Sequence, residues 1–265
     1  MGKGDKEART EAQARLAAER AAQKAADRRR SLIFGGATIA IVVVLGILVA
    51  VSVSKQSKSA SDVGPLPKGA NESTYGIEIG AGAINGGGDT EFNVKAAGAK
   101  TPVLDFYEDF QCPACKAFED ATSAGVNKLL SQGKAKAVYH PLAFLDRNLN
   151  NDASLRSANA SACAADEGKF LIFHDIVYTN QPKKEGTGYT DQQLLQFGVD
   201  AGITSKDFQT CVVGLKYQKW VQNGVEREAQ NRPVTATPTL YINGKELERP
   251  ITNESIAAAI AKASK

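Results

Sequence analysis

A Cys-x-x-Cys motif placed directly after an apolar, strand-like run constrains this chain more than any other feature. Residues 103–106 have the β-branched and aromatic character of a buried strand, and residues 114–130 carry apolar side chains at helical spacings. Cys112 therefore falls at the N-terminus of a predicted helix, where unpaired backbone N–H groups and the helix dipole favour a thiolate. We expect Cys112 to be the attacking sulfur and Cys115, one turn later, to be the resolving thiol.

A lone Cys-x-x-Cys can also be half of a structural zinc site, so the other cysteines and histidines matter. The chain has four cysteines, and the remaining two, Cys163 and Cys211, lie far apart in the sequence. Its two histidines are His140 and His174. Because structural zinc sites usually take two closely spaced ligand pairs, the sequence favours a redox pair and predicts no metal site.

A second motif supports the first. Residues 234–245, Val-Thr-Ala-Thr-Pro-Thr-Leu-Tyr-Ile-Asn-Gly-Lys, read as a proline loop, a strand and a hairpin turn. Together with residues 109–115, Asp-Phe-Gln-Cys-Pro-Ala-Cys, this segment resembles the DsbA-like thiol–disulfide oxidoreductases of the thioredoxin superfamily, particularly membrane-anchored actinobacterial forms. The resemblance covers residues 76–265. It implies an α/β thioredoxin-like fold with an inserted helical subdomain and no bound cofactor.

Four residues are expected to support the two cysteines. Pro113 suits the first helical position, where a missing N–H costs nothing, and Ala114 offers no side-chain hydrogen bond. The resemblance places Thr237 and Pro238 against the cysteines. We expect the peptide bond between them to be cis, since X-Pro bonds adopt cis far more readily than others. The backbone of Ala236 and Thr237 would then pair with an extended substrate.

One position departs from the family pattern. Relatives often carry an acidic residue on the strand six positions before the first cysteine, where it takes up a proton from the buried thiol, but Phe106 stands there. Asp105 is one residue away, and a one-residue shift sends a strand side chain to the opposite face of the sheet unless a bulge intervenes. Glu108 and Asp109 lie nearer to the motif, but acidic residues at these positions are equally expected if both side chains are exposed to solvent. These three carboxylates are left out of the predicted catalytic set.

The chain before this domain divides into three segments. Residues 1–30 carry a net charge of +4, with nine basic and five acidic residues, but they have no aromatic residue and no nucleic-acid-binding motif. We interpret them as a solvated cytoplasmic helical tail. Residues 31–53 are apolar and uncharged, and roughly 22 residues at 1.5 Å each span about 33 Å, enough for a transmembrane helix. Residues 54–75 are rich in Ser, Lys, Gly and Pro, which predicts a flexible linker.

The charges that flank the apolar segment predict its orientation. Residues 28–30 are three arginines, against Lys55 and Lys58 on the other side, so the N-terminus should lie in the cytoplasm and the domain outside. A secretory signal peptide is the alternative, but the apolar run is longer than its h-region and no Ala-x-Ala site follows. We expect a single-pass protein of the cell membrane whose domain lies where disulfides persist.

The middle of the domain changes its pattern. Residues 136–140 read as a second strand ended by Pro141, with His140 as a strand-end side chain. Apolar residues then recur at helical spacing over residues 151–232, which predicts a helical insertion. The predicted helices cover residues 153–165, 170–178, 194–201 and 212–225, with helix starts at 190–193 and 204–207. Apolar residues lie before and after the three glycines at 86–88, which suggests a small N-terminal hairpin.

The end of the domain reads as a hairpin and a last helix. A strand, the Asn243-Gly244 turn and residues 245–247 form the hairpin, and residues 253–263 form an amphipathic helix. Cys163 and Cys211 both fall in the insertion. Outside the membrane we expect them to be paired, closing a loop of about 48 residues that stabilises the domain by roughly 4 kcal/mol.

The resemblance implies disulfide exchange with exported proteins that carry reduced cysteines. It also implies re-oxidation by a membrane quinone-linked partner. The same motif serves disulfide reductases and isomerases, and the reduction potential separates them: about −120 mV for DsbA and −270 mV for thioredoxin differ by roughly 7 kcal/mol. A further alternative is a non-catalytic, membrane-tethered binding protein, because a fold does not guarantee activity.

Overall fold

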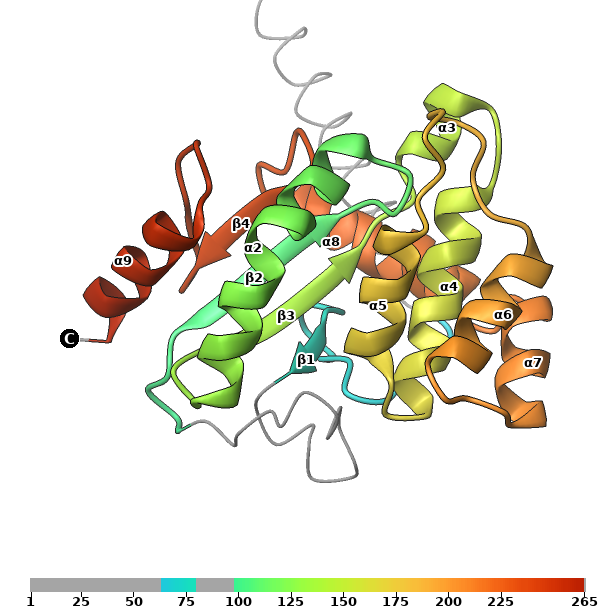
Figure 1. Ribbon diagram of the computed structural model, residues 1–265, viewed down its shortest axis with the longest axis horizontal. Coiled ribbons are helices and arrows are strands. Elements are labelled where there is room, and N and C mark those ends of the chain that lie inside the picture. The colour runs from blue at the N-terminus through green and yellow to red at the C-terminus, as the bar shows by residue number, and fades with distance from the viewer. Residues whose placement is uncertain (1–62, 80–97, 265) are drawn as a thin grey trace, which may run out of the picture. The chain divides into compact units, whose positions relative to one another are not determined.

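A five-stranded mixed sheet lies at the centre of the computed structural model, with strand order β1-β3-β2-β4-β5 (Figure 1). Central β2 pairs parallel with β3 and antiparallel with β4, and β1 and β5 form the edges. The strands are β1 (Ile77–Ile79), β2 (Val103–Glu108), β3 (Lys136–Pro141), β4 (Thr239–Ile242) and β5 (Lys245–Glu246). The predicted strands at 103–106 and 136–140 are confirmed, each extended at its C-terminal end.

The structure describes residues 63–79 and 98–264. Within them, no helix combines the length and the apolar character needed to cross a membrane. The predicted tail at 1–30 and the predicted transmembrane helix at 31–53 lie outside the described residues. So do the first residues of the predicted linker and the second strand of the predicted N-terminal hairpin.

Residues 63–75, which the composition assigns to a flexible linker, are packed against the domain. The Trp220 indole N–H donates to the Tyr75 carbonyl oxygen at 3.0 Å, and the Lys68 N–H donates to Asp166 at 3.0 Å. Gly224 allows this close approach, because a Cβ there would lie 3.0 Å from the side chains of Val63 and Tyr75. The ordered domain therefore begins before residue 76, held by contacts that composition does not reveal.

Helix α2 (Pro113–Ser131) crosses one face of the sheet, in front of the strands in Figure 1. It begins as predicted, with Cys112 as its N-cap and a proline at its start. Its apolar side packs into the core, where Phe118 lies 6.1 Å from Phe106 of β2, measured between ring centroids. The packing of α2 against the sheet holds the start of this helix in a fixed position.

The last helix, α9 (Asn253–Ala263), lies beside α2, and its predicted bounds are confirmed. Its first turn is held by a capping box between Thr252 and Ser255. Asn253 donates to the Ala121 carbonyl oxygen of α2 at 2.9 Å. The turn before it is also confirmed: Asn243 and Gly244 both have positive φ, 48° and 77°, as a type I′ turn requires.

The predicted helical insertion is confirmed. Its α-helices are α3 (Leu145–Leu149), α4 (Ala153–Asp166), α5 (Phe170–Thr179), α6 (Asp191–Asp200), α7 (Lys206–Val213) and α8 (Glu226–Asn231), with the π-helix η4 (Trp220–Val225) before α8. The capping box of Thr190 with Gln193 starts α6, and the Ser205 hydroxyl accepts from the Phe208 N–H at the start of α7. Short α3 was not predicted.

The predicted helix over 212–225 is wrong. Helix α7 ends at Val213, Leu215 takes a positive φ of 48°, and the chain becomes helical again at Trp220. The buried amide of Asn159 on α4 explains this break, because its oxygen accepts from the Tyr217 N–H at 2.8 Å. The apolar spacing of the segment records burial on both sides of the break and not one continuous helix.

Cys163 of α4 and Cys211 of α7 form a disulfide, as predicted. Both sulfurs are buried between the two helices, with side chains at most 7% exposed. The bond joins residues 48 positions apart and lies within the insertion. It fastens helix to helix at a place separate from the start of α2.

Candidate active site

Cys112 lies at the start of α2 with its sulfur against the proline loop. The sulfur is 3.7 Å from the Thr237 carbonyl oxygen. The Cys115 thiol, by hydrogen bonding, lowers the pKa of Cys112 most, and the Thr237 side chain and the backbone N–H groups of Cys115 and Ala114 lower it further. Burial opposes them, and the resulting pKa is about 6 instead of the usual 9.0. Cys112 is therefore a thiolate at neutral pH.

Cys115 has the opposite character. Its side chain is fully buried, and this burial raises its pKa well above 9.0. Donation of its hydrogen bond to Cys112 and the negative charge of Glu108 raise it further. The structure shows both cysteines as free thiols, so it represents the reduced pair. One sulfur carries the charge and the other carries the proton.

The proline loop has the predicted geometry. The Thr237–Pro238 bond is cis, and Pro238 is buried beside Thr237. Arg249 donates to the Pro238 carbonyl oxygen at 2.6 Å, and the Thr239 hydroxyl donates to the Ala236 carbonyl oxygen at 2.7 Å. The Arg249–Pro250 bond is cis as well, which the sequence reading did not anticipate.

The residues between the cysteines remain on the surface. Pro113 and Ala114 are both exposed, whereas Cys112 is 8% exposed. An incoming group therefore reaches the Cys112 sulfur past the start of α2 and the loop that contains Thr237. The structure thus brings together all six predicted residues of the site, while Cys163 and Cys211 lie elsewhere.

A buried cluster of Glu108, Glu119 and His174 lies next to Cys115. Their oxygen and nitrogen atoms come within 4.8 Å of one another, and His174 Nε2 is 3.1 Å from a carboxylate oxygen of Glu108. Burial raises the pKa of Glu119 well above its usual value, and the charge of Glu108 adds to that shift. Burial alone would lower the pKa of His174, but hydrogen bonds to Asp175 and Glu108 outweigh it and raise the pKa to about 10.

This cluster corrects the interpretation of the nearby carboxylates as solvated. Glu108 is 4% exposed and Asp109 is fully buried. Asp105, on the other face of β2, is buried too and lies 3.5 Å from His140, which stacks on the Tyr107 ring. Glu108 shares a strand face with Phe106, two residues earlier, so the period of two could have identified it as the acid facing the cysteines. Nothing in the sequence pointed to His174.

Two carboxylates and an imidazole are also metal-ligating groups. In this cluster, however, His174 Nε2 is already within hydrogen-bonding distance of Glu108. The raised pKa values of Glu119 and His174 let both groups keep protons at neutral pH, so the cluster needs no metal cation to be stable. We therefore interpret it as a proton-holding group and assign it no metal.

The segment between β2 and α2 is held by the helical insertion. Buried Asp109 accepts hydrogen bonds from Ser154 of α4 at 2.6 Å and from the Leu145 N–H of α3 at 3.2 Å. Burial raises the pKa of Asp109 to about 7, although these hydrogen bonds oppose the shift. Gln181 donates to the carbonyl oxygens of Phe110 and Cys112 at 2.8 and 3.1 Å. The insertion thereby fixes the backbone that carries Cys112.

The model of the family described as thioredoxin matches residues 97–262 of this chain. A putative protein-disulfide oxidoreductase of Rickettsia bellii is 26% identical over 165 residues, which are 62% of this chain and 61% of that protein. Oxidised DsbA of Mycobacterium tuberculosis superposes with a TM-score of 0.57 at 27% identity, covering 71% of this chain and 92% of that chain. DsbG of the same organism, in its reduced form, gives 0.55 at 31% identity, covering 63% and 85%.

Proposed function

This chain belongs to the thioredoxin family, as a DsbA-like thiol–disulfide oxidoreductase, and on that basis we propose that it introduces disulfides into exported proteins. The pKa of about 6 for Cys112 carries the proposal. A stabilised thiolate stabilises the reduced pair and so makes the Cys112–Cys115 disulfide a stronger oxidant. Among the three alternatives of oxidase, reductase or isomerase, and non-catalytic binding protein, this favours the oxidase.

The reaction divides the work between the two sulfurs. A substrate thiolate attacks Cys112 in the disulfide, the Cys115 sulfur leaves, and a mixed disulfide forms. A second substrate thiolate then releases Cys112 as a thiolate, so two electrons pass from the substrate to the protein's cysteine pair. Because the pKa of Cys115 is raised, its sulfur takes up a proton on leaving. Glu119 and His174, held by Glu108, are the nearby groups that carry protons.

Re-oxidation reverses the proton transfer. An external disulfide takes up the Cys112 thiolate, and Cys115 must then lose its proton to attack the new mixed disulfide. We propose that Glu108 accepts this proton, since the electrostatic effect of its carboxylate reaches Cys115 and raises the pKa of that thiol. A membrane quinone-linked protein would supply the oxidising disulfide.

The redox equilibrium of the Cys112–Cys115 pair against glutathione tests the proposed function. We expect a potential closer to about −120 mV than to −270 mV, and oxidation of a reduced, unfolded protein faster than glutathione disulfide achieves. A potential near that of thioredoxin would establish a reductase. A pair that does not equilibrate with glutathione would leave the binding-protein alternative.

We further propose that residues 31–53 anchor the domain in the cell membrane, with residues 1–30 in the cytoplasm and the domain outside. The charges flanking the apolar segment support this topology. Protease added to intact spheroplasts should remove the region around Cys112 and spare the segment before Ser31. Protection of Cys112 until the membrane is permeabilised would contradict the proposed topology.

A further inference from the structure

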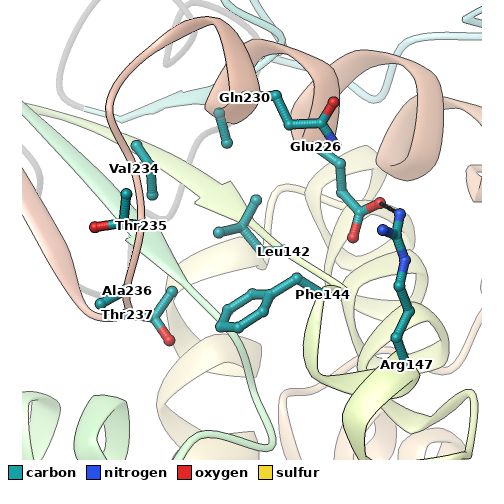
Figure 2. Close-up of a pocket in the computed structure, with 10 residues that line it drawn as sticks. Leu142, Phe144, Arg147, Glu226, Gln230, Val234, Thr235, Ala236 and Thr237 are labelled. Carbon is teal, nitrogen blue, oxygen red and sulfur yellow. Dashed lines mark ion pairs between the residues drawn. The ribbon is translucent and has the colours of Figure 1, made fainter.

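The proline loop, residues 234–238, is open on one side. There it borders a pocket of about 160 Å³, and Figure 2 shows Leu142 and Phe144 facing the loop across this space. Thr235 and Ala236 are exposed. A segment beside an open pocket has few packing contacts on that side. Hydrogen bonds must therefore do more to hold this loop than they do for a segment enclosed in the core.

The hairpin of β4 and β5 extends toward the loop but ends before it. The two strands pair antiparallel, and the Leu247 N–H donates to the Leu240 carbonyl oxygen at 2.8 Å. Two residues further along each strand, the same register would bring the Arg249 backbone N–H to the Pro238 carbonyl oxygen. Among the described residues, no backbone hydrogen bond joins these two positions.

The side chain of Arg249 provides the hydrogen bond that the backbone does not. Its guanidinium donates to the Pro238 carbonyl oxygen at 2.6 Å. A hydrogen bond from a charged donor is shorter and stronger than one between neutral groups. Arg249 is exposed and Pro238 is buried. The bond therefore ties the segment before α9 to the buried end of the proline loop.

A fixed carbonyl restrains the whole backbone around Pro238. The proline ring already sets φ of this residue, which leaves ψ as its one soft backbone dihedral. Since ψ determines the direction of the carbonyl group, the bond from Arg249 holds this remaining freedom. Thr237 is the residue next to Pro238, and its carbonyl oxygen lies 3.7 Å from the Cys112 sulfur. The hold on Pro238 is thus passed to the reactive sulfur through one neighbouring residue.

The charge of Arg249 does not need to reach Cys112 for this effect. The largest contribution to the lowered pKa of Cys112 comes from the Cys115 thiol, and burial opposes it. Thr237 follows, and the backbone N–H groups of Cys115 and Ala114 add to the shift. Thr237 is the contributor that belongs to the proline loop. A residue that controls where Thr237 lies therefore acts on the Cys112 sulfur indirectly.

The other parts of the loop have attachments of their own. Arg232, which lies before the loop, forms an ion pair with Glu228 of α8 at 2.7 Å. The Thr239 hydroxyl donates to the Ala236 carbonyl oxygen at 2.7 Å. Loss of the bond from Arg249 should leave these contacts in place. It should release the end of the loop that lies against Cys112 without unfolding the rest.

We propose that Arg249 is a positioning residue for disulfide exchange, because its bond to the Pro238 carbonyl oxygen holds Thr237 against the Cys112 sulfur. The inference rests on exchange at Cys112, which the proposed function includes, and it applies equally to an oxidase and to a reductase. Arg249 lies 11 residues after Pro238 and outside both sequence motifs.

Alkylation of Cys112 in the reduced full-length protein tests this role. The rate with iodoacetamide is measured against pH, and in the wild type it should be half-maximal near pH 6. Arg249→Met keeps a long side chain but removes the donor, so the half-maximal pH should lie about one unit higher. Arg249→Lys can still donate to the Pro238 carbonyl oxygen and should lie closer to the wild type. A residue with a purely structural role would not move this pH.

The equilibrium with glutathione provides a second measurement. One pKa unit corresponds to a factor of about ten at pH 8, so Arg249→Met should favour the oxidised cysteine pair about tenfold more than the wild type does. The matched control is Lys245→Met, which removes the same charge from an exposed position on β5, next to the hairpin turn. This control should leave both the alkylation profile and the equilibrium unchanged.

The outcomes separate a positioning role from a structural one. If Arg249→Met lowers the urea unfolding midpoint but keeps the alkylation profile of the wild type, Arg249 only stabilises the fold and the inference is wrong. An equal shift in Lys245→Met would also overturn it, since net charge would then be the cause. If Arg249→Met does not fold, Arg249→Gln, which is too short to reach the same carbonyl, takes its place with the same expected shift.

The two measurements also separate this inference from the function on which it rests. Alkylation reports the Cys112 thiolate whether or not the protein exchanges disulfides. If the alkylation profile shifts as expected but the wild type does not equilibrate with glutathione, the proposed function fails and the positioning by Arg249 stands. If the wild type equilibrates and neither measurement changes in Arg249→Met, the function stands and the positioning role is wrong.

Discussion

Cys112 lies at a helix N-terminus against the Thr237 carbonyl oxygen, whereas Cys163 and Cys211 are joined between α4 and α7. Each pair is buried. The groups around the first pair shift the pKa values of its two thiols in opposite directions, lowering that of Cys112 and raising that of Cys115. The second pair lies between two helices of the insertion and is joined as a disulfide.

The difference shows that burial alone does not decide whether a cysteine pair is chemically active. Reactivity requires a stabilised thiolate with an open approach, and Pro113 and Ala114 leave one side of Cys112 on the surface. Stability requires only that a bond closes a long loop. Exchanging the roles of the two pairs should therefore be impossible without moving a helix N-terminus.

The largest effect should come from removing either sulfur of the first pair. Cys112→Ala should abolish disulfide exchange, because no other thiol of the pair is ionised at neutral pH. Cys115→Ala keeps the attacking thiolate but removes the resolving thiol, so mixed disulfides on Cys112 should accumulate and be seen by mass spectrometry. A Cys115→Ala protein that traps no thiol partner would show that Cys112 is not the attacking sulfur.

Removing the second pair should lower stability and leave the chemistry intact. The double variant Cys163→Ala with Cys211→Ala loses the closure of a 48-residue loop, which is worth about 4 kcal/mol of unfolding free energy. Urea denaturation measures that loss, and the rate of glutathione exchange at Cys112 provides the comparison in the same sample. A variant that keeps its unfolding midpoint but loses exchange would reverse the roles that we assign to the two pairs.

Of the two cysteine pairs, only the first should make stability depend on pH. The folded-state pKa of Cys112 is about 6, below the usual 9.0, so its stabilisation of the reduced protein is complete above about pH 9 and is lost as pH falls through 6. Three pKa units correspond to about 3 kcal/mol once partial solvent screening is allowed for. Denaturation from pH 6 to 9 should therefore show stability rising more steeply with pH in the reduced than in the oxidised protein, since Asp109 and His174 titrate in both forms. Equal slopes would mean that the thiolate is not stabilised by the fold.

The smallest expected effect concerns proton transfer at Cys115. Glu108→Gln keeps the shape of the side chain but removes its charge, so Cys115 should lose its proton more slowly and re-oxidation by glutathione disulfide should slow about tenfold. The matched control is Asp105→Asn, a buried carboxylate on the opposite face of β2, which should leave this rate unchanged. Similar slowing in both variants would point to general destabilisation instead of proton transfer at Cys115.

Local sequence patterns predicted much of the structure around the two cysteine pairs. They missed the features that depend on contacts between residues far apart in the sequence. The strand predicted at 103–106, the start of α2 and the Asn243-Gly244 turn follow from local chemistry, and the sequence shows each of them. His174 reaches Glu108 across 66 residues, and the Asn159 amide that accompanies the break after α7 is 58 residues from Tyr217. Such pairs are set by how helices of the insertion pack, which periodicity does not encode.

The misjudged carboxylates had a different cause. The family pattern directs attention to position 106, where Phe106 stands, and Glu108 is left out of the predicted catalytic set because a solvated position also accounts for it. Glu108 occupies the same face of β2 one pleat further along, nearer to Cys112 in sequence, and its burial comes from the α2 and α5 side chains that cover it. The alternation of side chains along the strand is a better guide to the acidic residue that faces the cysteines than its exact position in the family pattern.

The hydrogen bonds from the insertion to the segment before α2 bear on how this protein could be rebuilt. Gln181, Tyr189 and Ser154 all come from the insertion, and they hold Phe110, Cys112 and Asp109. An engineer who cut out the insertion to obtain a minimal thioredoxin would remove these donors from the carbonyl and carboxylate groups before α2. Transplanting the Cys-Pro-Ala-Cys segment alone into another scaffold would likewise carry the sulfurs without their supports. The transferable unit is the motif together with the part of the insertion that forms hydrogen bonds to it.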